Sequence, residues 1–171
     1  MKKLLTICLL TLLWGCSNKD LDLSGETNIK PSDYVTAFTP INGNFSVSDT
    51  NFIKKADTIK IGVKALLQFM PDSAVQQMVK NEKKETIYPV GVIEKETEKY
   101  FLILVKSKKT AKLFVYVTDQ KLKYLGNKEL LNNETKDAYA RSVSINKEPT
   151  FVISKETYSK DKELKFSRSG W

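Results

Sequence analysis

The chain has 171 residues, enough for one domain but hardly for two. Its 28 lysines and arginines outnumber its 20 acidic residues, and it contains no histidine. The lack of histidine excludes an imidazole base, a Ser–His or Cys–His pair and a histidine-ligated zinc ion. The seven glycines form no phosphate-binding loop motif. We therefore expect no catalytic residues, no metal and no cofactor.

The positive charge is carried almost entirely by lysine, because Arg141 and Arg168 are the two arginines of the chain. Proteins that read nucleic acids depend on clustered arginine for bidentate contacts with bases and phosphates. Here the lysines are spread over predicted loops and strands, which is typical of a solvated surface. We predict no nucleic-acid partner, and an anionic glycan or lipid headgroup is the alternative ligand for this charge.

The first residues have the composition of an export signal. Lys2 and Lys3 are followed by an apolar run over residues 4–13. A membrane-spanning helix needs about 20 apolar residues, so this run is too short for a stable membrane anchor. We interpret residues 1–15 as a signal peptide and leave them out of the reasoning about the fold.

The signal ends in Leu13, Trp14, Gly15 and Cys16. This sequence resembles the lipobox of bacterial lipoproteins, in which leucine lies three residues before the cysteine and glycine or alanine lies directly before it. Trp14 departs from the small residue that is usual at its position. The resemblance implies cleavage before Cys16, a diacylglycerol on its sulfur, and acyl chains such as palmitate. Each buried methylene contributes roughly 0.8 kcal/mol, so two or three chains hold a protein stably on a membrane.

The sequence after the signal predicts a tether followed by a single domain. Residues 16–33 are polar and aperiodic, as expected of a flexible tether, and residues 34–171 form the β-rich domain. Cys8 lies inside the signal, so no cysteine is left for a disulfide. Ser17 rather than aspartate follows Cys16, and in the lipoprotein resemblance this implies the outer membrane, facing the periplasm or the cell surface.

The first part of the predicted domain has little regular structure. Residues 34–52 contain spaced aromatics and turn residues, which predict irregular chain with one or two short strands. Residues 59–63 alternate like a strand. Pro71 then interrupts the chain, and Asp72 and Ser73 are good N-cap residues for a short helix near residues 73–81. The helix places three apolar residues on one face as core contacts: Val75, Met78 and Val79.

The remainder reads as short strands separated by polar turns, typical of an antiparallel meander, small barrel or sandwich. The strands are expected over residues 87–93, 100–106, 112–118, 122–131, 140–146, 150–155 and 164–167. Residues 101–105 are apolar on both faces and are predicted to form the central strand, and residues 113–117 are also expected to be covered on both sides. Trp171 is interpreted as closing the open end of the core.

Two tripeptides, at residues 57–59 and 72–74, match the Asp-(Ser/Thr)-apolar pattern of periplasmic O-glycosylation. They make Thr58 and Ser73 candidate O-glycosylation sites, although capping explains Asp72 equally well. Residues 69–74 and 88–91 resemble outer-membrane lipoproteins of the Bacteroidota. This resemblance is confined to the middle of the chain and implies no activity.

We predict a non-enzymatic, lipid-anchored envelope lipoprotein whose β domain binds a macromolecular partner, as an immunity protein or inhibitor does. The alternative is a surface accessory protein that binds a glycan or another nutrient through exposed aromatics such as Tyr34, Tyr124 or Tyr158. An exposed apolar patch would favour a protein partner, and clustered exposed aromatics would favour a glycan. A pair of buried carboxylates in a cleft would favour the third alternative, an enzyme.

Overall fold

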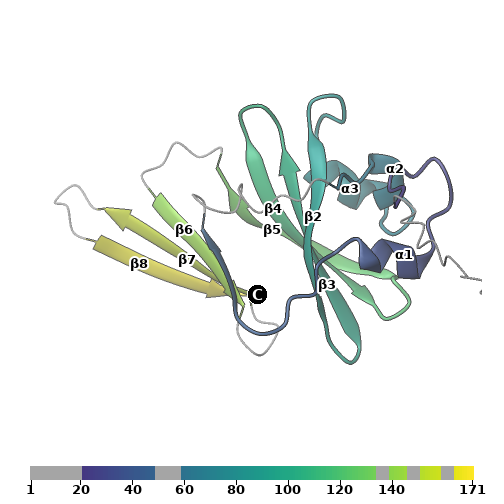
Figure 1. Ribbon diagram of the computed structural model, residues 1–171. Helices are drawn as coiled ribbons and strands as arrows, with labels where there is room; N and C mark the ends of the chain where they lie inside the picture. The colour runs from purple at the N-terminus through teal and green to yellow at the C-terminus, as the bar shows by residue number, and fades with distance from the viewer. Residues whose placement is uncertain (1–20, 49–58, 134–138, 146–150, 159–163) are drawn as a thin grey trace, which may run out of the picture.

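The computed structural model describes residues 21–48, 59–133, 139–145, 151–158 and 164–171. Within these ranges the chain forms two antiparallel four-stranded sheets and three short helices (Figure 1). The mainly β fold that the strand pattern predicts is confirmed. In the described part of the chain, no helix is long and apolar enough to cross a membrane.

The first sheet, sheet A, is a meander of consecutive hairpins that contains β2 (Thr86–Glu94), β3 (Glu98–Lys106), β4 (Ala111–Asp119) and β5 (Tyr124–Asn132). The second sheet, sheet B, has the order β1-β6-β7-β8 and contains β1 (Phe45–Ser48), β6 (Tyr139–Ile145), β7 (Phe151–Tyr158) and β8 (Leu164–Gly170). The helices are α1 (Pro31–Thr36), α2 (Val63–Leu66) and α3 (Asp72–Met78).

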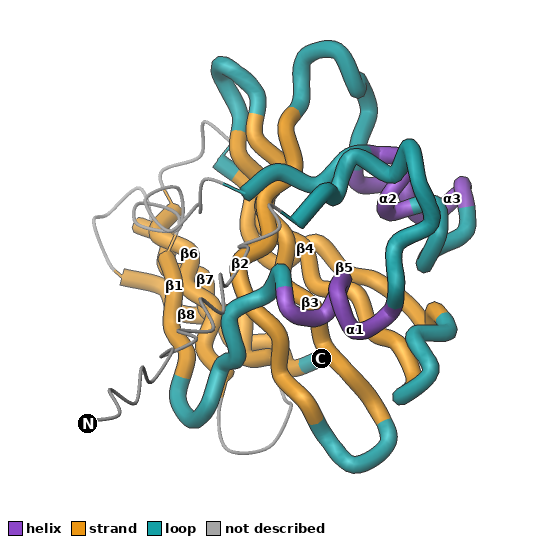
Figure 2. Tube along the Cα trace, turned by 45° about the vertical axis from the view of Figure 1, so that its right-hand side comes forward, coloured by secondary structure: helices purple, strands orange, loops and turns teal. Residues whose placement is uncertain are grey.

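The molecule has three layers, with sheet A in the middle. The helices lie on one side of sheet A and sheet B lies on the other (Figures 1 and 2). One core joins the helices to sheet A and includes Tyr34, Leu66, Met78, Phe101 and Tyr116. The second core joins the two sheets and includes Leu102, Leu104, Val143, Ile145 and Phe151.

Strand β3 supplies both cores, as its continuous apolar run predicts. Side chains alternate between the two faces of a strand, so Phe101 and Ile103 enter the helical core while Leu102 and Leu104 enter the core between the sheets. Residues 101–105 are at most 2 % exposed. Residues 113–117 of β4 are buried in the same two-sided way. The prediction of a central strand at residues 101–105 is therefore confirmed.

Among the described residues, sheet B has one buried face, which packs against sheet A. Val143 and Ile145 of β6 face sheet A together with Phe151 of β7. The opposite face carries serines in cross-strand register, such as Ser46 with Ser144 and, across three strands, Ser48 with Ser142 and Ser154. These serines are half-buried or exposed, because no described element lies over that face.

The outer edges of the two sheets differ. On β2, the Ile41 N–H donates to the Val92 carbonyl at 2.8 Å, and the Val92 N–H donates to the Thr39 carbonyl at 2.9 Å. Further along the same edge, the Ile61 N–H donates to the Ile87 carbonyl at 2.9 Å. The edge of β2 is therefore covered at two places, whereas β8 pairs with β7 alone among the described strands.

The predicted tether is wrong from Leu21 onward, because this part of the chain belongs to the folded domain. Leu23 is 2 % exposed and lies in the helical core. Its carbonyl accepts a hydrogen bond from the Gly62 N–H at 2.7 Å. The reason is that the few apolar residues of this polar stretch, Leu21, Leu23 and Ile29, all pack against the helical core. The last residues of the expected tether form the start of α1.

The helices also correct several expectations. Helix α1 lies where irregular chain is predicted from residue 34 onward. The strand predicted at residues 59–63 is not formed: Ile61 makes an isolated β-bridge with Ile87, and α2 begins at Val63. Helix α3 begins at Asp72 and ends at Met78, because Val79 adopts extended dihedral angles. Its N-cap is Pro71, so Asp72 and Ser73 are not caps. The predicted core face of this helix is confirmed by the burial of Val75, Met78 and Val79.

Candidate functional site

A shallow groove opens where the two sheets meet, beside the end of β8. Its volume is about 270 Å³, and its walls come from three strands of sheet A and from the residue after β8. The lining residues are Glu98, Tyr100, Val117, Leu125, Gly126 and Trp171. Four of these six residues carry an apolar or aromatic side chain, which is the usual lining of a binding site.

The floor of the groove is a row of residues across sheet A. Tyr100 pairs with Val117, and Val117 pairs with Gly126, so the three residues lie side by side on β3, β4 and β5. Directly paired residues share a face of an antiparallel sheet, and here the face is the one toward sheet B. A Cβ atom at Gly126 would meet no atom within 4 Å. The groove is therefore open at Gly126 because this residue lacks a side chain.

Aromatic rings form the wall nearest sheet B. The ring of Phe151 lies between those of Tyr100 and Trp171, with a centroid distance of 5.8 Å to each. The backbone of Trp171 continues the β7–β8 ladder, since its N–H and carbonyl both bond to Phe151, at 3.1 and 2.8 Å. The Lys128 Nζ lies 5.6 Å from the centre of the Trp171 ring, within cation–π range.

A polar pair borders the groove at the start of β3. The Tyr100 hydroxyl donates a hydrogen bond to a carboxylate oxygen of Glu98. Burial, this hydrogen bond and the negative charge of Glu98 raise the pKa of Tyr100 to about 12. The phenol therefore stays protonated at neutral pH and keeps donating to Glu98, which gives one side of the groove a fixed acidic group.

Four large apolar side chains of the described residues are exposed, and two of them lie in this groove. Leu125 is 52 % exposed and Trp171 is 40 % exposed, while Ile59 and Leu67 lie elsewhere. Trp171 was expected to close the end of the core; its ring does pack on Phe151, but much of it remains at the surface.

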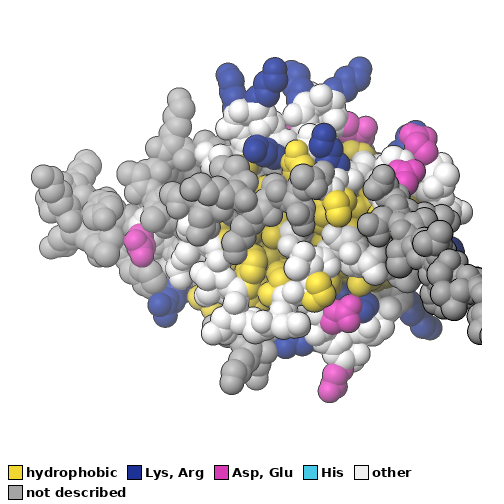
Figure 3. All heavy atoms as spheres, viewed as in Figure 1, with side chains coloured by type: hydrophobic (Ala, Val, Ile, Leu, Met, Phe, Trp, Pro, Cys, Tyr) yellow, Lys and Arg dark blue, Asp and Glu magenta, His cyan; other side chains and the backbone are white. Residues whose placement is uncertain are grey.

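Lysines gather at another end of the molecule, at the top of Figure 3. This end carries the β3–β4 hairpin and the loop before β2, which contribute the exposed Lys83, Lys84, Lys108 and Lys109. Glu82 is exposed in the same loop, and the Glu85 carboxylate accepts hydrogen bonds from the N–H groups of residues 80 and 81. The lysine-rich end is thus separate from the groove.

The aromatics predicted as a glycan platform are not brought together. Tyr34 is fully buried, and its hydroxyl lies 2.6 Å from the Tyr116 hydroxyl inside the helical core, so its prediction as an exposed platform is wrong. Tyr124 is half-buried against the same core. The side chain of Tyr158 lies outside the described residues. Strand alternation predicts the face on which Tyr100 lies, but no sequence pattern indicates that Leu125 and Trp171 line the same groove.

The other candidate residues are placed as follows. Ser73 is exposed in the first turn of α3. Cys16 and Thr58 lie outside the described residues. Within the described part of the chain, the buried polar or charged residues are Lys112 and Thr118, so no buried carboxylate pair is found there. The same residues contain no group of three or more potential metal ligands among His, Cys, Asp and Glu.

Comparisons with known proteins found no matching family model, no matching curated protein and no matching solved structure.

Proposed function

We propose that this chain is a lipid-anchored envelope protein whose β domain binds a macromolecular partner, foremost a protein, through the groove at Leu125 and Trp171. The observation that carries the proposal is the pair of exposed large apolar side chains on an open-floored groove. Exposed apolar patches that are rimmed by polar residues mark interaction sites. Tryptophan and tyrosine are also the residues that most often dominate binding energy at protein interfaces.

The binding test uses two substitutions that change the groove without entering the core. Leu125→Arg places a charge on an exposed apolar position, and Gly126→Val fills the open floor with a side chain that suits a strand. The matched control is Leu67→Arg, since Leu67 is 41 % exposed and lies on the helical side. All three are expected to change the free energy of unfolding by about 0.5 kcal/mol or less.

The measurement is a pull-down from solubilised envelope, followed by titration of the enriched protein. We expect the natural chain and Leu67→Arg to bind the same protein, and Leu125→Arg and Gly126→Val to bind it at least about tenfold more weakly. The unanchored Cys16→Ser chain should still bind in detergent. Equal binding by all variants, or no enriched protein with any of them, would contradict the proposal.

The lipid anchor has its own test. Cells that express the full chain are grown with a clickable palmitate analogue, and the label on the natural chain is compared with that on Cys16→Ser. We expect label on the natural chain alone and its recovery in the outer-membrane fraction. Equal labelling of the two chains would refute Cys16 as the lipid site.

A second candidate ligand for the same groove is a glycan, which the half-exposed ring of Trp171 beside Glu98 and Lys128 favours. Trp14 and Trp171 are the two tryptophans of the chain, so after cleavage before Cys16 the tryptophan fluorescence, excited selectively over that of the tyrosines, reports Trp171 alone. Soluble neutral and anionic oligosaccharides are titrated against this signal. A saturable change that Gly126→Val abolishes would favour the glycan, and an unchanged spectrum would leave the protein partner as the function.

A further inference from the structure

The segment that enters the domain from the N-terminal side is held closely against α2 and the residues after it. The Gly62 N–H bonds to the Leu23 carbonyl at 2.7 Å. The Gln68 amide donates to the Thr27 carbonyl at 2.9 Å and accepts from the Ile29 N–H at 2.9 Å. A Cβ at Gly25 would lie 2.2 Å from the Ala65 nitrogen, so the two backbones are in direct contact. The folded domain therefore begins close to Leu21.

This packing limits how far the domain can lie from Cys16. Four residues, at positions 17–20, separate Cys16 from Leu21. At 3.8 Å per Cα–Cα step, the two Cα atoms are at most about 19 Å apart, whatever conformation the chain between them adopts. A domain of this size has a radius of gyration of about 15 Å. A lipid on Cys16 thus leaves too little chain for the domain to turn over freely above a membrane.

We propose that the face around Leu21, Lys60, Lys64 and Leu67, here called the anchor face, lies against the lipid headgroups, so that sheet B and the groove point away from the membrane. The inference rests on the proposed acylation of Cys16 and adds an orientation to it. Leu21 and Lys60 line one hollow beside α2 together with the acidic Asp22, Glu82 and Glu85. Lys64 and Leu67 are exposed on the outer side of the same helical turn.

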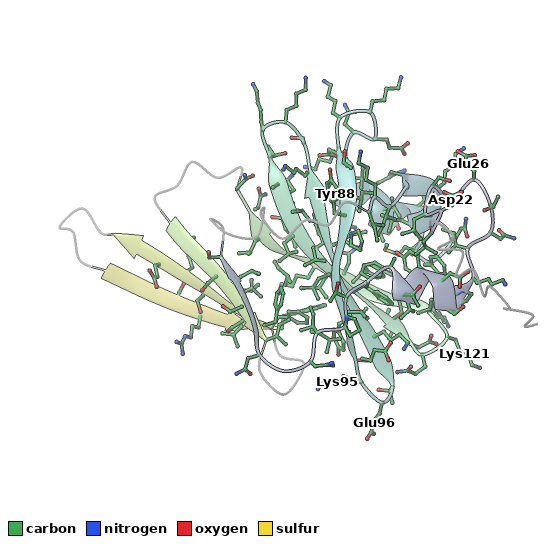
Figure 4. The ribbon with its side chains drawn as sticks, in the orientation of Figure 1. Asp22, Glu26, Tyr88, Lys95, Glu96 and Lys121 are labelled. Carbon is green, nitrogen blue, oxygen red and sulfur yellow. The ribbon has the colours of Figure 1, made fainter. Side chains whose placement is uncertain are left out.

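The chemistry of the anchor face is compatible with headgroups. Ile59 and Leu67 are two of the exposed large apolar side chains of the described residues, at 37 % and 41 %. Lys60 can extend its charged end toward phosphates while its stem covers apolar surface. The Lys64 Nζ lies 2.9 Å from a Glu26 carboxylate oxygen, so its charge is paired within the protein. Asp22 and Glu26 also lie at this rim, on the side away from sheet B (Figure 4). Because the charges are mixed, the short chain to Cys16, rather than electrostatic attraction, sets the orientation.

The order of the three layers determines which surface of the domain faces away from the membrane. The anchor face belongs to the helical layer, sheet A lies behind it, and sheet B lies behind sheet A (Figures 1 and 4). Stacked sheets are about 10 Å apart, so sheet B is the layer farthest from the anchor face. The groove between the sheets is therefore reached from the aqueous side, and a partner at Trp171 is a soluble protein or an exposed part of another envelope protein.

The test compares two exposed leucines, Leu67 on the anchor face and Leu125 in the groove. Leu67→Cys and Leu125→Cys are made separately in a Cys8→Ala background, where acylation of Cys16 leaves the introduced cysteine as the single free thiol. The full lipidated chain is labelled with a fluorophore in detergent and reconstituted into vesicles of phosphatidylethanolamine and phosphatidylglycerol. Lipids that carry a headgroup quencher then report how close each label lies to the membrane.

We expect the Leu67→Cys label to be quenched several-fold more strongly than the Leu125→Cys label. Inserting about 20 Gly/Ser residues after Asp20 adds a root-mean-square span of about 25 Å and should remove that difference. Equal quenching of the two labels without the insertion, in protein that floats with the vesicles, would overturn the orientation but not the anchor. Protein that does not float would overturn both.

Discussion

The two sheets differ in how many of their faces are covered. Sheet A is packed between the helices and sheet B, so Phe101, Leu102 and Ile103 are all fully buried although their side chains alternate in direction. Sheet B packs on sheet A with one face and presents serines on the other. Burial on both faces, rather than strand length, therefore distinguishes the central sheet of this molecule from its outer sheet.

The difference also divides the roles of the two sheets. Sheet A belongs to both cores, so a change in it is felt on both sides. Sheet B contributes one apolar face, the described edge at β8 and the aromatic wall of the groove. The groove draws on both sheets, because five of its six lining residues lie on sheet A and Trp171 directly follows β8.

The largest effect is expected from substitutions on the outward faces of the two sheets. Ile103→Ala removes a fully buried side chain under the helices and should lower the free energy of unfolding by about 2–5 kcal/mol. Val152→Ala on the open face of sheet B, where Val152 is half-buried, should cost less than about 1 kcal/mol. Urea unfolding measures both. Similar losses would show that the two outward faces are equally covered, contrary to the structure.

A smaller loss of stability is expected from replacing a glycine that packs against the helical layer, compared with a glycine in open space. Gly25 has a positive φ of 83°, and an added Cβ would lie against the backbone of α2. We therefore expect Gly25→Ala to lower the free energy of unfolding by about 2–3 kcal/mol. Gly43→Ala, the matched control, has a φ of 94° but open space around its Cβ, so about 1 kcal/mol of strain remains. Thermal and urea unfolding compare the pair. Equal losses would mean that residues 21–29 do not hold the helical layer in place.

The smallest effect comes from the buried pair of hydroxyls between α1 and β4. Tyr116→Phe leaves the Tyr34 hydroxyl buried without its partner and should cost about 1–2 kcal/mol. The double variant Tyr34→Phe/Tyr116→Phe leaves no unpaired group from this contact and should cost less than the sum of the single changes. Urea unfolding of all four proteins completes the cycle, and strictly additive losses would contradict the pairing.

The same pair predicts a pH dependence. Burial raises the pKa of both phenols above the ordinary value of 10.0. In the unfolded chain they lose their protons near pH 10, whereas in the folded chain they keep them. The free energy of unfolding contributed by the pair is therefore complete below about pH 10 and falls as the pH rises above it. The double phenylalanine variant should lose less stability between pH 9 and pH 11.

The central strands could be predicted from the sequence because a continuous apolar run such as residues 101–105 is stable as a strand only when both of its faces are buried. The helical layer could not, because α1 and α2 span six and four residues and offer too few turns for a 3.6-residue period. The burial of Leu23 could not be predicted because Leu21 and Leu23 are two leucines in an otherwise polar stretch, too few for a periodic pattern. The groove was missed for another reason: Trp171 reaches Tyr100 and Leu125 through the pairing of β7 with β8, a long-range contact.

The covered edge of β2 has a consequence for how copies of this protein meet. Gly91 lets Thr39 and Ile41 approach so closely that a Cβ there would lie 2.5 Å from the Ile41 side chain. Because this edge is covered at Val92 and at Ile87, a neighbouring molecule cannot pair along the full length of β2, and such edge pairing is the usual route to ordered aggregates. Copies of the protein are therefore protected from cross-β association at the covered positions, and amide exchange at Val92 should stay slow even at high protein concentration.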